Sequence, residues 1–75
     1  MKVRYDQDVD ALYIELRHLE PGTAENRVLT EEITLDYGPD GKLAGIEVID
    51  ASAVLGEELD RVTLEISPAR LKRSA

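Results

Sequence analysis

The stretch ITLDYGPDGKLAGIEVI, residues 33–49, decides the fold because it alternates apolar and polar residues on both sides of a turn. In its first five residues every second side chain is apolar, which indicates a strand with one buried face. The central Gly-Pro-Asp-Gly favours a tight turn, since proline pre-sets φ and glycine accepts a positive φ. The stretch therefore predicts a β-hairpin in which Tyr37 pairs with Leu43.

The returning half of this hairpin changes its phase. Ile46 and Val48 have the opposite parity to the first apolar residue of this half, so a regular strand would turn them to the wrong face. A bulge near Ala44 and Gly45 adds one residue and restores the apolar face. We therefore predict a kinked strand over residues 42–49.

The same period of two recurs before the hairpin. Residues 1–5 and 11–17 alternate apolar and polar side chains, and the Asp-rich segment 6–10 lies between them as a turn. Residues 24–29 follow a Pro-Gly break and predict a further short strand. Short connections between these strands favour antiparallel pairing.

A short helix is predicted directly after residue 49. Asp50 or Ser52 can cap its first turn by accepting a hydrogen bond from an unpaired amide, and Gly56 weakens it. Four residues at helical spacing give the helix one apolar face: Ala51, Val54, Leu55 and Leu59.

Residues 62–66 alternate again and predict a last strand that ends before Pro68. The alternative is that this strand leaves the sheet and pairs with a second copy of the chain. Together the patterns predict an α+β, mostly β fold. It consists of an antiparallel sheet of about five strands in hairpins, with one short helix after the fourth or fifth strand.

The composition bounds the class of protein. The chain has 75 residues and no cysteine, so hydrophobic burial or self-association must stabilise its single small domain, predicted over residues 1–66. A homodimer is therefore expected. The 9 basic and 16 acidic residues give a net charge of -7, which makes nucleic acid an unfavourable partner, although the C-terminal tail 67–75 is basic. No stretch is long and apolar enough for a membrane span, so we expect a cytoplasmic protein without a membrane partner.

The sequence offers no recognisable catalytic set. Asp6, Asp8 and Asp10 have the spacing of the first ligands of a calcium loop. Ala11 and Arg17, however, stand where that loop needs a glycine and a glutamate. The one histidine has no cysteine or second histidine as a partner. We therefore predict no catalytic residues, no metal and no cofactor.

Two stretches carry a resemblance to a known family: YDQDVDALYI, residues 5–14, and LDYGPDGKLAGIEVIDAS, residues 35–52. Together they resemble the small bacterial and archaeal domain-of-unknown-function family numbered 2283, which has no established activity. The resemblance points to six polar or aromatic motif positions as candidate contacts with a partner or ligand: Tyr5, Asp6, Asp10, Tyr13, Asp36 and Glu47.

Most of these six positions also have a structural interpretation. Asp6 and Asp10 can accept amide hydrogen bonds that fix the first turn, and the tyrosines can pack their rings while the hydroxyl groups stay in water. Glu47 lies between two β-branched residues that we expect to be buried, where an acid contributes little to the fold. Glu47 is therefore the first candidate for a functional contact.

The resemblance and the charge together imply an accessory or antitoxin-like protein. The expected function is a non-enzymatic protein-interaction module whose acidic sheet face or exposed edge binds a basic protein partner. The alternative is a carboxylate-based metal or small-molecule site that uses Asp6, Asp10, Asp36 or Glu47.

Overall fold

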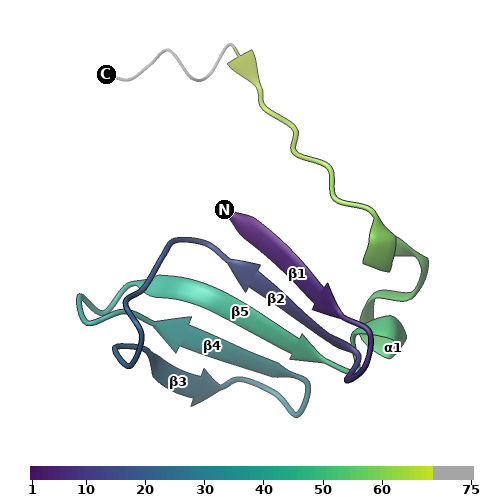
Figure 1. Cartoon of the computed structure of the whole chain (residues 1–75). Helices are drawn as coiled ribbons and strands as arrows, with labels where there is room; N and C mark the ends of the chain where they lie inside the picture. Colours follow the sequence, from purple (N-terminus) through teal and green to yellow (C-terminus); the bar gives the residue numbers. More distant parts are fainter. Residues whose placement is uncertain (69–75) are drawn as a thin grey trace.

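The structure, a computed structural model, describes residues 1–68 and consists of one antiparallel sheet that leads into two short helical segments (Figure 1). The strands lie in the order β1-β2-β5-β4-β3, which confirms the predicted five-stranded, mostly β fold with a helix after the fifth strand. The elements are β1 Lys2–Asp6, β2 Ala11–Glu15, β3 Glu25–Val28, β4 Ile33–Tyr37, β5 Leu43–Ile49, the α-helix α1 Ala51–Leu55 and the 3-10 helix η1 Gly56–Asp60.

The hairpin of β4 and β5 forms as its sequence predicts. Tyr37 pairs with Leu43, whereas Asp36 pairs with Gly45, so Ala44 is the extra residue of a bulge. Gly41 takes a φ of 80°, the left-handed conformation that the return of the chain requires. The predicted kink and the predicted pairing are both confirmed.

The register gives the sheet an apolar face and a polar face. Val48 on β5 pairs with Leu12 on β2 and with Ile33 on β4, so these three side chains lie on the apolar face. On the other face Glu47 lies between Tyr13 and Thr34. The two central strands therefore position both the core and the polar groups.

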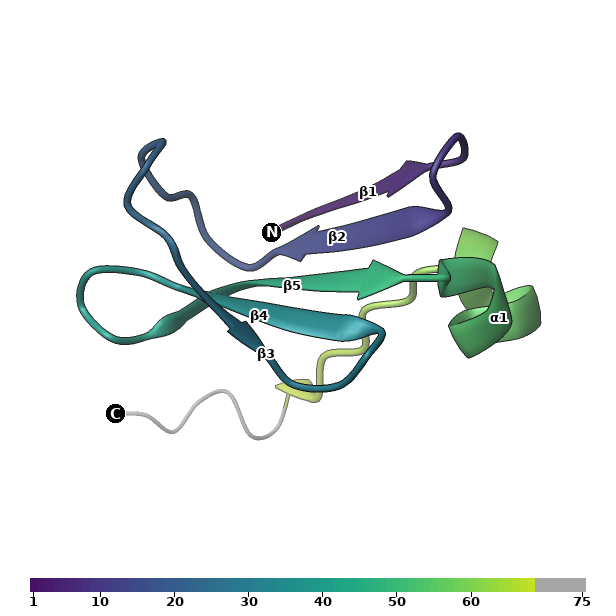
Figure 2. The same ribbon diagram turned by 90° about the horizontal axis from the view of Figure 1, so that it is seen from below.

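The core is small and lies at one end of the apolar face. It is built around Leu12, Val48 and Ala51, and α1 and η1 add Leu55 and Leu59 to it. Figure 2 shows the helices at the end of the sheet where β5 finishes, so they cover only part of the apolar face. Away from them, Val3 and Tyr5 of β1 remain 39% and 36% exposed.

The start of α1 differs from the prediction. Asp50 takes a left-handed φ of 52° and its side chain makes no capping hydrogen bond. Gly56, with a φ of 59°, separates α1 from η1. Val54 is 46% exposed, so the prediction that it belongs to the buried apolar face of the helix is wrong. The helix is shorter than the apolar spacing suggests because its continuation winds as a 3-10 helix.

The last predicted strand is not formed within the chain's own sheet. Residues 61–67 carry no regular secondary structure and lead away from η1 (Figure 1). An alternating sequence forms a strand only beside another strand, and the described part of the chain places none there. Most of the predicted basic tail, residues 69–75, lies outside the described residues. Within residues 1–68, no helix has the length and apolar character needed to cross a membrane.

Candidate functional site

The first group of motif residues joins the turn after β1 to the start of α1. The Tyr5 hydroxyl donates to Asp10 Oδ1 at 2.6 Å. Ser52 donates twice to the same carboxylate, from its amide to Oδ1 at 3.0 Å and from its hydroxyl to Oδ2 at 2.7 Å. The Asp10 carbonyl also accepts the Ala51 amide at 3.0 Å. Asp10 therefore caps α1 from another part of the chain.

This arrangement explains the conformation and the electrostatics of Asp10. Its left-handed φ of 54° lets both its carbonyl and its carboxylate reach the helix start. The hydrogen bonds from Tyr5 and Ser52 favour the ionised carboxylate and lower the pKa of Asp10. The bond to Asp10 raises the pKa of the Tyr5 hydroxyl in return. We call Tyr5, Asp10 and Ser52 the helix-cap triad.

The second group crosses β5 on the polar face. The Tyr13 hydroxyl donates to Asp36 Oδ2 at 2.8 Å, and the Asn26 side-chain amide donates to the other carboxylate oxygen. These three residues come from β2, β4 and β3, so the group joins the two halves of the sheet. Burial, together with the hydrogen bond to Asp36, raises the pKa of Tyr13 to about 12.

Gly45 makes the crossing possible. Tyr13 must pass over β5 to reach Asp36, and it does so at Gly45, which pairs with Asp36 in the neighbouring strand. A Cβ at position 45 would lie only 2.6 Å from Cζ of the Tyr13 ring. Any side chain there would therefore displace the ring and break the bond to Asp36. We call Tyr13, Asp36, Asn26 and Gly45 the cross-sheet lock.

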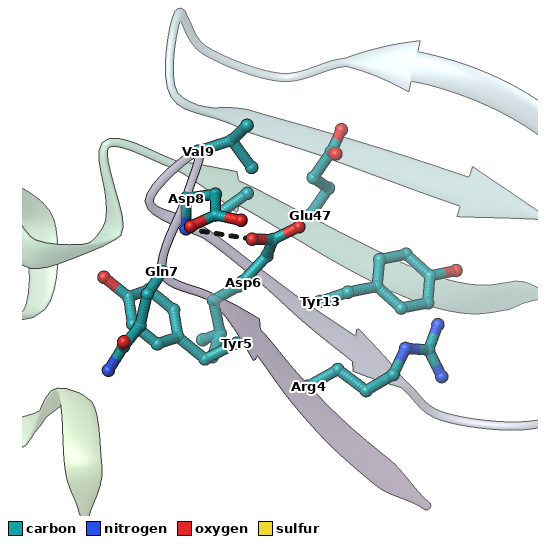
Figure 3. Close-up of a pocket in the computed structure, with 10 residues that line it drawn as sticks. Arg4, Tyr5, Asp6, Gln7, Asp8, Val9, Tyr13 and Glu47 are labelled. Atoms are coloured by element: carbon teal, nitrogen blue, oxygen red, sulfur yellow. Dashed lines mark hydrogen bonds between the residues drawn. The ribbon is translucent and has the colours of Figure 1, made fainter.

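Three acids that belong to neither group surround an open hollow on the polar face. The hollow lies between the turn after β1 and the strands β2 and β5, and Asp6, Asp8 and Glu47 contribute to its wall (Figure 3). Asp6 Oδ1 accepts the Asp8 amide at 3.0 Å, as predicted for this turn. The Glu47 side chain is exposed and makes no hydrogen bond or ion pair to any residue that the structure describes. We call this feature the acidic hollow.

Arg4 and Tyr13 form the other part of the hollow. The Arg4 guanidinium lies over the Tyr13 ring, with Cζ 5.2 Å from the ring centroid. It also pairs with Glu15 through a 2.9 Å contact between Nη1 and Oε1. The hydrogen bond from Arg4 lowers the pKa of Glu15. Arg4, the base that lines the hollow, is therefore already paired with an acid that lies outside the hollow.

The six predicted positions are thus divided between three features. Tyr5 and Asp10 belong to the helix-cap triad, and Tyr13 and Asp36 belong to the cross-sheet lock. Asp6 and Glu47 line the acidic hollow, and Tyr5 and Tyr13 also contribute to its lining. The structure brings Glu47 opposite Thr34 rather than Asp36, so these two acids do not form a directly paired site. A contact of the six positions with a partner or ligand stays a prediction.

The sequence did not predict the contacts of four residues that complete these features: Asn26, Gly45, Ser52 and Arg4. Ser52 ends the second motif, and its sequence position predicts a partner in the first turn of its own helix rather than Asp10. Asn26 lies opposite Asp36 only once β3 pairs with β4. The exposed polar sequence of β3 predicts its pairing only weakly. The contacts of Ser52 with Asp10 and of Asn26 with Asp36 could therefore not be predicted from spacing along the chain.

The acids do not gather into a metal-binding arrangement in the described part of the chain. Among residues 1–68, no group of three or more histidine, cysteine, aspartate or glutamate side chains is placed to hold an ion. The carboxylates of Asp10 and Asp36 instead accept hydrogen bonds from tyrosine, serine and asparagine.

These features define a class: a small antiparallel sheet whose motif residues fix a helix start and hold the two halves of the sheet together. The chain belongs to the family described as a protein of unknown function (DUF2283), which matches residues 2–52. The match ends at Ser52, the residue that completes the helix-cap triad. No curated protein and no solved structure matches the chain.

Proposed function

We propose that the protein is a non-enzymatic interaction module whose acidic hollow binds a basic side chain of a protein partner. Glu47 is the observation that carries this proposal. It stands exposed on a central strand, between a residue of the core and one packed against it, and no described residue satisfies its carboxylate. A strand position of this kind gains stability from a β-branched or aromatic side chain, so an acid there suits contact with a partner better than folding.

The charges around the hollow support a cationic partner. Asp6, Asp8 and Glu47 face one arginine, and Glu15 already pairs with that arginine. The chain as a whole carries a net charge of -7, which repels acidic partners and speeds encounter with basic ones. A lysine or arginine side chain in the hollow would meet the carboxylates of Asp8 and Glu47, which accept no hydrogen bond from the described residues.

The wider setting of this proposal is an accessory or antitoxin-like role in the cytoplasm, in which the chain covers a basic surface of its partner. We also propose that the chain is a homodimer. Its core is thin for 75 residues, and part of its apolar sheet face is uncovered by α1 and η1. Association would bury that face and add the apolar burial that a small domain lacks.

The test is affinity purification of the tagged full chain from its host, with mass spectrometry at low and moderate salt. Wild type should recover a basic protein that is lost at moderate salt, because exposed charges are screened beyond about 10 Å at 0.1 M ionic strength. Glu47→Gln should lose that protein. Glu57→Gln is the matched control, since it removes the same charge from exposed η1, and it should retain the protein. Recovery of the bait alone, or equal recovery by all three chains, overturns the proposal.

A metal or small-molecule site receives less support from the geometry. Four acids are predicted to form such a site, and two of them, Asp10 and Asp36, already accept hydrogen bonds from side chains within the fold. A ligand that binds the native state raises the melting temperature. A panel of Ca²⁺, Mn²⁺ and Zn²⁺ that raises it in wild type but not in Glu47→Gln would favour this alternative over a protein partner.

A further inference from the structure

The segment after η1 has the pattern of a strand but no neighbouring strand. Val62, Leu64 and Ile66 alternate with Arg61, Thr63 and Glu65. The three apolar side chains are 74%, 78% and 61% exposed. Arg61 already has extended backbone angles, with φ -133° and ψ 124°. Residues 61–66 are therefore exposed, and in an extended strand their apolar and polar side chains would point to opposite sides.

The edge strand β1 offers the complementary surface. It pairs on one side with β2 and forms one end of the strand order, so its outer side lacks a neighbour in the described sheet. Its residues on the apolar face, Val3 and Tyr5, are more than a third exposed. The opposite edge, β3, suits the segment less well, because Glu25 and Arg27 share the apolar face there.

One antiparallel register pairs opposite charges and apolar side chains across the two strands. If Arg61 lies opposite Asp6, Thr63 lies opposite Arg4 and Glu65 lies opposite Lys2. The other face then pairs Val62 with Tyr5 and Leu64 with Val3. Both charged pairs are of opposite sign, and both apolar pairs fall on the apolar face. Opposite charges and apolar pairs directly across two strands are the contacts that stabilise a sheet.

Other arrangements lose these matches. A parallel arrangement would bring Arg61 to the end of β1 that carries Lys2, and Glu65 to the end that carries Asp6, so like charges would meet. An antiparallel shift by two residues, with Arg61 opposite Arg4, places like charges together and leaves Glu65 beyond the strand. The opposite shift, with Arg61 opposite Asp8, keeps Glu65 opposite Arg4 but takes Arg61 beyond the end of β1, so only the proposed register places both charged pairs within the strand.

We propose that residues 61–66 of one copy add to β1 of a second copy in this register, and that the exchange is reciprocal. The inference rests on the proposed homodimer and names the surface that forms it. The segment leads away from its own sheet (Figure 1), which places it to reach another molecule. Reciprocal exchange closes the assembly with two-fold symmetry and pairs an exposed edge in each copy.

The absence of cysteine from the natural chain permits a direct test by crosslinking. Two full-length variants with different tags, Val3→Cys and Leu64→Cys, are mixed, allowed to exchange and oxidised. The proposal expects a mixed disulfide between the two tagged chains, because directly opposite residues fall within the reach of a disulfide. Val3→Cys with Thr63→Cys is the control; it should crosslink far less, since residue 63 would point to the other face.

Charge exchange provides the second test. Arg61→Asp and Asp6→Arg should each weaken the dimer by roughly 2- to 30-fold, because each places two like-charged pairs in a symmetric assembly. A mixture of the two variants should recover the wild-type dissociation constant, since every pair is then opposite in sign. Analytical ultracentrifugation measures all three.

The outcomes separate this inference from the proposed dimer. A dimer that forms without the mixed disulfide, and without recovery in the charge mixture, overturns strand exchange but leaves the homodimer. A double variant Val3→Cys, Leu64→Cys that oxidises to a closed monomer shows that the segment returns to its own β1, which also overturns exchange. A chain that is monomeric at every concentration contradicts both proposals.

Discussion

Ser52 and Asp10, 42 positions apart in the chain, are joined by two hydrogen bonds through which the turn after β1 caps α1. A cap supplied from such a distance makes the helix depend on the sheet. With five residues, α1 is far too short to be stable alone in water. The hydrogen bonds also hold Ala51, a fully buried residue, against the core.

Removing the Ser52 hydroxyl should therefore destabilise the whole domain. We expect Ser52→Ala to lower the free energy of unfolding by about 1 kcal/mol, the typical contribution of one hydrogen bond. That corresponds to a fall in melting temperature of roughly 4–8 °C for a domain of this size. Ser52→Thr should retain most of the stability. Ser67→Ala, at an exposed position outside the sheet and helices, is the control; an equal loss in both alanine variants would contradict the capping role.

The cross-sheet lock predicts a coupling between Gly45 and Tyr13. Gly45→Ala should cost about 1–3 kcal/mol in unfolding free energy, because the added methyl group overlaps the Tyr13 ring. In a Tyr13→Ala background the same change should cost much less, since the ring is gone. Urea unfolding of the two single variants and the double variant gives the coupling energy. Additive losses would show that Gly45 is required only by the bulge.

The hairpin could be predicted because its determinants are local. The turn residues between Tyr37 and Leu43 and the change of parity after Ala44 are all within one short stretch, and each limits the backbone directly. The helix-cap triad and the cross-sheet lock depend instead on contacts between residues that are distant in sequence. Asp10 could be assigned to its own turn with equal local logic, because a carboxylate accepts any amide within reach.

The segment 62–66 illustrates a different limit. Its alternation predicts a strand with one apolar and one polar side, but a period of two does not say which strand lies beside it. Glu47 shows the opposite case. An acid between two apolar β-branched residues contributes little to a strand, which makes Glu47 a functional candidate from the sequence. In the structure Glu47 is exposed and lines the acidic hollow.

Stability should fall in acid, and Asp10 should contribute to that fall. The pKa values of Asp10, Glu15 and Asp40 are lowered in the fold, first of all by side-chain hydrogen bonds from Tyr5, Arg4 and Arg17 respectively. The unfolded chain therefore binds protons more readily than the native chain, and the stabilisation that these groups provide is complete only above their ordinary values of 3.8 and 4.5.

The melting temperature should accordingly be constant from pH 7 to about pH 5 and decline below it, as protonation proceeds through the lowered values. Asp10→Asn should be less stable at pH 7 and show a shallower decline. Asp60→Asn, on exposed η1, provides the comparison and should keep the wild-type profile. Thermal unfolding followed by circular dichroism measures all three; parallel profiles for wild type and Asp10→Asn would refute the contribution of Asp10.

Substitution of Glu47 should separate folding from function. Glu47→Thr places a β-branched residue of high strand propensity on central β5 and removes one carboxylate from the acidic hollow, so both effects favour the native state. We expect its free energy of unfolding to equal or exceed that of wild type, by up to about 1 kcal/mol, the span of strand propensity in a host protein. The same variant should lose the basic partner. If urea unfolding instead shows Glu47→Thr to be clearly less stable than wild type, then Glu47 supports the fold, and its exposure on the hollow no longer argues for a contact with a partner.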